Sequence, residues 1–224
     1  LAGAWGAAWG GRGSPAAGDP TGGRGLFFGP RAGVPLPDDR LLVTDTGNHR
    51  LQTLDRNGAF IGSVGSFGNQ PGQFNEPVGL AAAPDGSIYV ADTWNGRVQR
   101  LSADLLPLGE WAVNAWDSQS INNKPYLATD SSGRVYVTDP EGYRVLVFSP
   151  TGAYLNRFGQ FGADANSLGL PNGIAVGLDD SLWVADAGNH RVLGYAPLFG
   201  AAAVPGGVPA GDAVLEPTVA GQGE

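Results

Sequence analysis

The chain has 224 residues, of which 37 are Gly and 17 are Pro, and it carries a formal net charge of −8. This Gly and Pro content excludes a helical protein, while recurring short runs of Val, Leu, Ile and aromatic residues exclude a disordered one, so many short strands joined by tight turns are predicted. The negative charge disfavours phosphate backbones as partners, and the absence of Cys excludes disulfides and thiolate metal sites.

A repeat of 47 residues runs through the chain. An Asp and an Arg recur together at this spacing, in the pairs Asp45 and Arg50, Asp92 and Arg97, Asp139 and Arg144, and Asp186 and Arg191. An apolar residue opens each unit, at Phe27, Phe74, Ile121 and Leu168. We therefore divide the chain into repeat units 27–73, 74–120, 121–167 and 168–199. Residues 1–26 are expected to hold the outer strand of a blade and a linker, and the Ala-, Gly- and Pro-rich residues 200–224 to lack a core of their own.

Each unit contains the pattern of four strands. In the first unit we predict strands near residues 32–36, 41–45, 50–55 and 60–65, and the later units repeat them 47 residues further on. The runs are apolar on both faces, as expected of strands packed between neighbouring sheets. The turn between the second and third strands is marked by sequences such as Asp92–Gly96, with Asn-Gly at its end. Four antiparallel strands in a repeat of roughly 40–50 residues are typical of a propeller blade, so the predicted fold class is an all-β propeller with four four-stranded blades.

The segments Asp45–Leu51 and Asp186–Val192 resemble the signature of NHL repeats, and Gly72–Pro77 and Ala83–Gly86 match the same family's blade. The third unit also resembles propellers appended to bacterial membrane proteins of the glycosyltransferase type. The NHL resemblance implies a ring of six blades, of which this chain shows four. Either residues 1–9 complete the last blade in a closed four-bladed ring by pairing near residues 191–196, or two blades are missing upstream, which the absence of Met favours.

The repeated Asp and Arg are interpreted as structural, because a single active site does not require four copies of one device. An Asp can accept backbone N–H groups at a tight turn, and an Arg across the hairpin can meet it. The only two histidines, His49 and His190, lie in the same turn, and a zinc site usually needs three protein ligands. The family's amidating lyases place zinc-binding histidines directly after the blade proline, where this chain has Arg31, Val78, Tyr126 and Asn172. We therefore expect no catalytic residues, no metal and no cofactor.

The candidate binding site consists of residues that depart from the repeat. Turns between strands two and three and the connectors between blades open on the same face of a propeller. The departures on that face are Trp94, Trp116, Asp117, Gln119, Asn122, Asn123, Lys124, Glu141 and Tyr143. Aromatic rings beside amide and carboxylate groups suit stacking on sugar or peptide surfaces. The connectors beginning at Ser66 and Gln160 read as bland. The alternative is that Trp116 and Tyr126 only fill the interface between sheets.

The sequence therefore predicts a non-catalytic binding or scaffold module that recognises a protein or carbohydrate partner, with no nucleic acid. A lyase or hydrolase using the same face and a structural spacer of a larger membrane-linked protein are the alternatives. A bacterial origin and an extracytoplasmic or cell-surface location are expected. Membrane association is expected only through a segment upstream of the chain, because no stretch approaches the roughly 20 apolar residues of a spanning helix.

Overall fold

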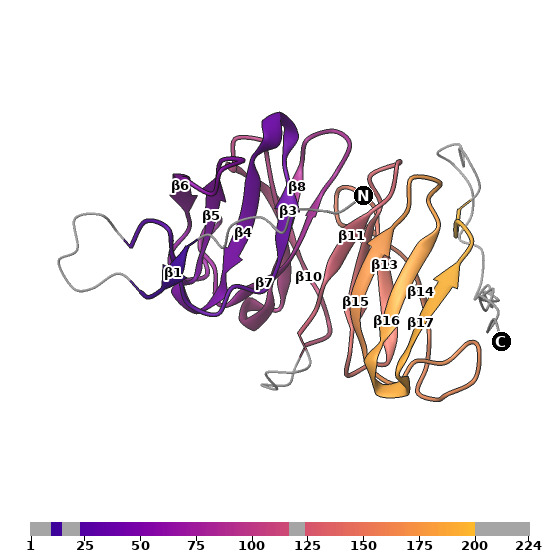
Figure 1. Cartoon of the computed structure of the whole chain (residues 1–224). Coiled ribbons are helices and arrows are strands. Elements are labelled where there is room, and N and C mark those ends of the chain that lie inside the picture. The colour runs from indigo at the N-terminus through magenta and orange to yellow at the C-terminus, as the bar shows by residue number, and fades with distance from the viewer. Residues whose placement is uncertain (1–9, 15–22, 117–123, 200–224) are drawn as a thin grey trace, which may run out of the picture.

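A computed structural model of the chain describes residues 10–14, 23–116 and 124–199, and the architecture is all-β (Figure 1). Four antiparallel sheets follow one another as the blades of a propeller. The first blade contains β3 (Gly33–Pro35), β4 (Leu41–Asp45), β5 (Arg50–Leu54) and β6 (Phe60–Val64). The second contains β7 (Pro77–Ala82), β8 (Ile88–Asp92), β9 (Arg97–Leu101) and β10 (Pro107–Ala112). The predicted fold class is confirmed.

The third blade contains β11 (Leu127–Thr129), β12 (Val135–Asp139), β13 (Arg144–Phe148) and β14 (Tyr154–Phe158). The fourth has three described strands, β15 (Pro171–Val176), β16 (Leu182–Asp186) and β17 (Arg191–Tyr195). A short parallel pair, β1 (Gly11–Arg12) and β2 (Leu26–Phe27), precedes the first blade. The helical turns are single 3₁₀ turns: η1 (Pro37–Asp39), η2 (Thr46–Asn48), η3 (Thr93–Asn95) and η4 (Ala187–Asn189). The predicted strand windows are therefore confirmed throughout the described part of the four units.

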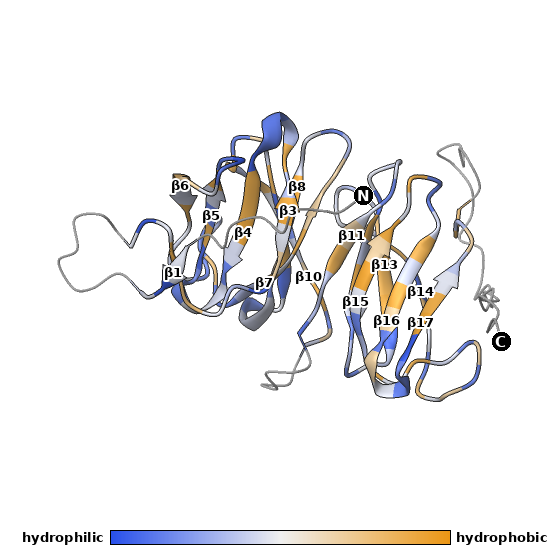
Figure 2. Ribbon diagram, in the orientation of Figure 1, coloured by the Kyte–Doolittle hydropathy of each residue, from blue (hydrophilic) through white to orange (hydrophobic). Residues whose placement is uncertain are grey.

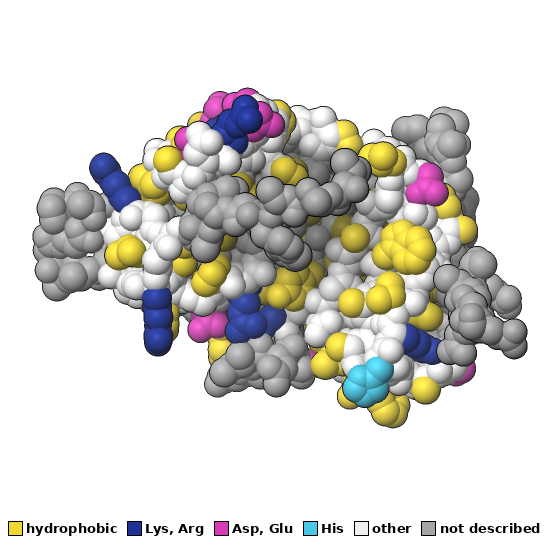
Figure 3. All heavy atoms as spheres, in the orientation of Figure 1, with side chains coloured by type: hydrophobic (Ala, Val, Ile, Leu, Met, Phe, Trp, Pro, Cys, Tyr) yellow, Lys and Arg dark blue, Asp and Glu magenta, His cyan; other side chains and the backbone are white. Residues whose placement is uncertain are grey.

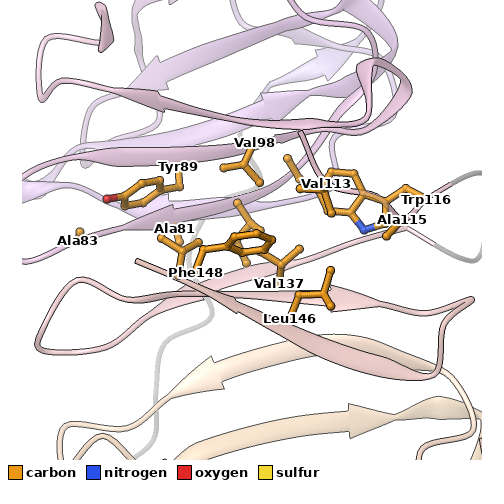
Figure 4. Close-up of a cluster of buried hydrophobic side chains, with 13 residues drawn as sticks. Ala81, Ala83, Tyr89, Val98, Val113, Ala115, Trp116, Val137, Leu146 and Phe148 are labelled. Carbon is orange, nitrogen blue, oxygen red and sulfur yellow. The ribbon is translucent and has the colours of Figure 1, made fainter. Parts of the chain in front are cut away.

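Apolar clusters between consecutive sheets hold the blades together. Between the second and third blades, Ala81, Tyr89 and Val98 pack against Val137 and Phe148, as Figure 4 shows. Similar clusters lie between the first and second blades and between the third and fourth. Figure 2 shows the hydrophobic residues along the strands and the hydrophilic residues at the turns. Burial of both faces of a sheet explains why the strand sequences are continuous apolar runs.

The first and fourth blades lie at opposite ends of the row of sheets in Figure 1. The expected pairing of residues 1–9 with the strand near 191–196 concerns a segment outside the described residues. The predicted absence of a core in residues 200–224 also falls outside them.

Candidate functional site

An Asp–Arg ion pair joins the second and third strands beside the turn in every blade. Each Arg donates a hydrogen bond from Nε to an Oδ2 atom of its Asp, at 2.7–3.0 Å, in the pairs Asp45–Arg50, Asp92–Arg97, Asp139–Arg144 and Asp186–Arg191. All four Asp side chains are buried. Buried carboxylates need charged or hydrogen-bonding partners, and the pairing across the hairpin supplies them.

The same side chains also hold the backbone of the connector that leads into their blade. In the second blade, Arg97 donates to the carbonyl groups of Asn69, Gln70 and Gln73. Asp92 accepts the N–H of Asn75 at 2.7 Å. Arg191 repeats this in the fourth blade, with the carbonyls of Ala163, Asp164 and Ser167. The turn thus fixes the course of each incoming connector.

The Asn of the turn adds a further backbone contact. Its Nδ2 donates both to the Asp of the same turn and to a connector carbonyl; the three pairs with the connector are Asn48 with Gly13, Asn95 with Gly68, and Asn189 with Gly162. Amide donors of this kind affect the acidity of the Asp. Burial opposes ionisation of Asp186, but hydrogen bonds from Asn189, from backbone N–H groups and from Arg191 outweigh it and lower the pKa of Asp186.

Aromatic pairs lie where the turns meet the connectors. The turns end in left-handed backbone, at His49 with φ 55° and at Tyr143 with φ 54°. The ring of His49 makes an edge contact with Phe67 at 5.0 Å between centroids, and Tyr143 contacts Phe161 at 4.7 Å. Phe67 and Phe161 are 66% and 72% exposed, which makes them the most exposed Phe, Tyr or Trp side chains among the described residues. We call the surface carrying His49, Phe67, Trp94, Tyr143 and Phe161 the turn-and-connector face.

The ion pair of Glu76 and Lys124 lies beside Trp94. Trp94 belongs to the second blade, while His49 and Tyr143 belong to the first and third blades. Trp94 donates from its indole Nε1 to Glu76 Oε2 at 2.6 Å, and Lys124 Nζ lies 3.4 Å from the same oxygen. The Lys124 ammonium also lies 4.9 Å from the centroid of a Trp94 ring, a cation–π contact. Lys124 is buried, while Trp94 and Glu76 are partly exposed.

The predicted exposure of Trp116 is wrong. Trp116 is only 7% exposed and belongs to the cluster between the second and third blades. Its indole Nε1 donates to the carbonyl of Thr138 at 3.1 Å, so both the ring and its polar atom are satisfied inside the protein. A backbone φ of 71° at Trp116 accompanies this inward position. Trp116 is therefore a packing residue, as the alternative interpretation held, and is withdrawn from the binding site.

The other predicted site residues fall into three groups. Trp94, Glu141 and Tyr143 are partly exposed and lie in turns between second and third strands, as predicted. Lys124 is buried against Glu76 and Trp94 and does not present a free ammonium. Asp117, Gln119, Asn122 and Asn123 lie outside the described residues.

The interpretation of the first and third connectors as bland is also wrong, because these two connectors carry the most exposed aromatic residues of the face. A usable signal was present in the sequence. Phe67 and Phe161 lie two residues before Asn69 and Ala163, at equivalent positions of two units, where the second unit has Asn114. Exposure itself cannot be read from residue type, since the neighbouring Phe74 is fully buried.

His49 and Glu76, two acid–base groups of this region, are in contact with each other. Among the described residues, His, Asp and Glu form no group of three that could hold a metal ion. His49 Nδ1 accepts the backbone N–H of Glu76 at 3.1 Å, which places the proton of a neutral imidazole on Nε2. On the side of the molecule that Figure 3 draws, the charged side chains of the described residues form small separate groups.

The sequence model of the NHL repeat matches residues 74–101 and 168–195, which are the first three strands of the second and fourth blades. The chain is an NHL-repeat propeller. The Asp–Arg pair extends the same arrangement to the other two blades of this NHL propeller. Among curated proteins, none matches the sequence.

Solved structures share the fold of the NHL propeller at low sequence identity. Virginiamycin B lyase from Staphylococcus aureus is similar with a TM-score of 0.55 and 16% identity, over 73% of this chain and 51% of that one. A putative exported protein from Bacteroides fragilis gives 0.54 and 17%, over 74% and 47%. A chain of a nidogen–laminin complex gives 0.51 and 22%, over 72% and 58%. The NHL propeller thus spans about half the length of the solved chains that it resembles.

The described residues of the NHL propeller contain no helix with the length and apolar character needed to cross a membrane.

Proposed function

We propose that this NHL propeller is a non-catalytic binding module that recognises a protein or carbohydrate partner through the turn-and-connector face. The observation that carries the proposal is the exposure of Phe67 and Phe161, at 66% and 72%. Large exposed aromatic side chains are energetically unfavourable in water and are common anchors of binding surfaces.

Contacts within the chain already fix the positions of the two proposed anchors, Phe67 and Phe161. Each ring rests on a turn residue, Phe67 on His49 and Phe161 on Tyr143. Their connectors are fixed by hydrogen bonds from the signature turns of the following blades, including those of Arg97 and Arg191 to connector carbonyls. A preorganised surface loses less conformational entropy on binding, which raises affinity.

The composition of the face suits an uncharged or mixed surface on the partner. The rings can stack on sugar or peptide groups, and the Glu76–Lys124 pair lies beside Trp94 to supply charged hydrogen-bonding groups. A net charge of −8 works against a phosphate backbone. The fold likeness to a nidogen–laminin complex chain is compatible with a protein partner, and that to a putative exported protein with a location outside the cytoplasm.

A lyase is the second candidate, and one observation favours it. His49, Glu76 and Lys124 bring an imidazole, a carboxylate and an amine to one part of a propeller that resembles virginiamycin B lyase in fold. General acid–base chemistry needs such groups close together. If this candidate is correct, the chain opens virginiamycin B in a turnover assay and His49→Ala abolishes the activity; absence of turnover by the wild-type chain excludes that substrate.

Binding is tested with a glycan array and a peptide array, both probed with the wild-type chain and with Phe67→Ser/Phe161→Ser. The best wild-type ligand should lose affinity by about 1–3 kcal/mol per anchor, as truncated aromatic anchors do. Leu106→Ser is the matched control, because Leu106 is 63% exposed and lies between the third and fourth strands of its blade, on the opposite face. Equal affinity of the double variant and the wild type would contradict the proposal. If neither array yields a ligand, the chain is better described as a structural spacer.

A further inference from the structure

A cleft with a volume of about 220 Å³ lies between the second and third blades. The third blade contributes five side chains to it: Arg144, Leu146, Phe148, Tyr154 and Arg157. Leu146 pairs with Arg157 and Phe148 with Tyr154 in the register of the sheet, so these side chains share one face. That face is turned to the second blade, since Leu146 and Phe148 belong to the cluster between the two sheets (Figure 4). The opposite wall lies at the outer edge of the second blade and includes Asn114.

The charge at this place is reversed relative to the preceding blade. In the second blade, Arg97 donates from Nε to Asp92 and from an Nη atom to Glu110, at 2.7 and 2.8 Å. The residue 47 positions after Glu110 is Arg157. One arginine therefore meets two carboxylates in the second blade, while two arginines line the cleft of the third blade and share one carboxylate, Asp139.

The hydrogen-bonding side chain that fills this place in the second blade is also replaced. Gln99 donates to Asp92 there, but the equivalent residue of the third blade is Leu146. Among the described residues, the guanidinium of Arg157 has no hydrogen-bond or ion-pair partner, and Arg144 uses only its Nε atom. Two cations in one cleft repel each other unless an anion lies between them. The cleft therefore offers N–H groups and positive charge to an anionic ligand.

The groups that line the cleft favour a carboxylate attached to an apolar neighbour. Planar guanidinium groups donate to a carboxylate in parallel pairs of hydrogen bonds. At the other end of the cleft, the rings of Phe148 and Tyr154 lie 5.9 Å apart in an edge contact, and Tyr154 is 56% exposed. An apolar side chain of the ligand can pack on these rings.

Two other kinds of anion fit the cleft less well. A uronic acid would place hydroxyl groups against Leu146 and Phe148, whose side chains cannot form hydrogen bonds with them. A nucleic acid is disfavoured by the net charge of −8. A peptide, by contrast, supplies a carboxylate and an apolar side chain on one chain.

From these observations we infer that the cleft binds an acidic peptide segment of the partner, with a Glu or Asp carboxylate between Arg144 and Arg157 and an apolar side chain on Phe148 and Tyr154. Phe148 lies two residues after Leu146, the register partner of Arg157. Side chains two residues apart lie on the same side of an extended chain. The acidic and apolar residues of the ligand should therefore be separated by one residue.

The cleft adjoins the turn-and-connector face. Asn114 occupies the connector position that Phe67 and Phe161 hold in the neighbouring units. The inference thus rests on the proposed function and narrows its partner to an acidic peptide. It depends on two arginines and not on the exposed Phe residues, so the two proposals can be tested separately.

The test uses the blocked tripeptide acetyl-Glu-Ala-Phe-amide, in which the Glu side chain is the only carboxylate, and acetyl-Gln-Ala-Phe-amide as the uncharged control. Each is titrated into the full chain and followed by NMR. The wild type should bind the Glu peptide about 10-fold or more tightly than the Gln peptide, because the bonds are charge-assisted. Arg157→Gln and Arg157→Glu should both lose this preference.

Arg157→Glu should also raise the melting temperature by about 1–3 °C without any ligand. The new carboxylate would meet Arg144 as Glu110 meets Arg97 in the second blade. A melting temperature below that of the wild type would contradict the charge argument. Circular dichroism confirms that both variants are folded before their binding is interpreted.

Arg56→Glu is the matched control, because it makes the same change of charge at a residue of the first blade whose side chain is 74% exposed, and it should keep the preference. Phe67→Ser/Phe161→Ser should keep it as well. Loss of the preference in that double variant but not in Arg157→Glu overturns the inference and leaves the proposed function standing. Equal binding of the two peptides by the wild type also overturns it, as does tighter binding of inorganic phosphate or of a glucuronic acid oligosaccharide than of the Glu peptide.

Discussion

Removal of Arg97 should destabilise the fold more than removal of its equivalent in the fourth blade. Arg97 makes two ion pairs, with Asp92 and Glu110, and donates to three connector carbonyls. Its side chain is only 9% exposed, so water cannot replace these bonds in Arg97→Ala. Breaking a buried ion pair costs about 3–5 kcal/mol, because the remaining charge stays buried.

The loss of unfolding free energy in Arg97→Ala should lie at the lower end of this range, because Asp92 retains other hydrogen-bond donors. Asp92 keeps the N–H of Asn75 and the side-chain amides of Asn95 and Gln99 as donors. We therefore expect a loss of about 3 kcal/mol in the free energy of unfolding. Arg191 is 26% exposed and has one ion pair, so Arg191→Ala should cost about 1–2 kcal/mol.

The assay is urea unfolding followed by circular dichroism, with both variants and the wild type under the same conditions. Amide hydrogen exchange supplies an independent measurement, since the connector amides of Gln73 and Phe74 should exchange faster in Arg97→Ala and not in Arg191→Ala. Equal losses in the two variants, or a loss within error of zero for Arg97→Ala, would refute the reasoning that burial of the pair determines its contribution.

Two further predictions concern the buried residues Asp186 and Trp116. The pKa of Asp186 is lower in the folded chain than the ordinary value of 3.8, so its stabilising contribution is complete above 3.8 and is lost as the pH falls through the folded value. The difference in unfolding free energy between wild type and Asp186→Asn should therefore be about 1–3 kcal/mol at neutral pH and shrink in acid; a difference independent of pH would contradict the assignment. Trp116→Phe should lower the free energy of unfolding by about 1–3 kcal/mol, through loss of the bond to Thr138, while binding on the arrays stays unchanged; reduced binding with unchanged stability would return Trp116 to the site.

The fold could be predicted from the sequence because its determinants are local and repeated. Asp92 and Arg97 are five residues apart and stand at the ends of two adjacent strands, so the repeat of this pair locates each hairpin. The predicted second strands coincide with β4, β8, β12 and β16 for the same reason. The sequence also predicted that neighbouring sheets pack face to face, since strands that are apolar on both faces must be covered on both sides.

The site could be predicted only in part, because exposure depends on the path of the connectors. Trp116 and Phe67 are both aromatic residues in connectors, yet the first points into the interface between blades and the second into solvent. That difference follows from backbone geometry, including the left-handed φ of Trp116, which residue type does not reveal. Departure from the repeat therefore located two partly exposed turn residues, Trp94 and Tyr143, whose role in binding stays a prediction, and it was misleading for the buried Trp116.

The hydrogen bonds between the signature turns and the connectors have a consequence for how such a protein can evolve. The Arg and Asn side chains of the second and fourth blades bind connector carbonyl groups, and Asp92 binds a connector N–H group. The main-chain carbonyl group is the same in every amino acid, and every amino acid except proline also has a main-chain N–H group. A connector can therefore exchange one solvent-facing side chain for another, as at Phe67, Asn114 and Phe161, while its backbone keeps the same anchors. New recognition surfaces become accessible by single substitutions on an unchanged frame, much as antibody loops vary on a constant sandwich.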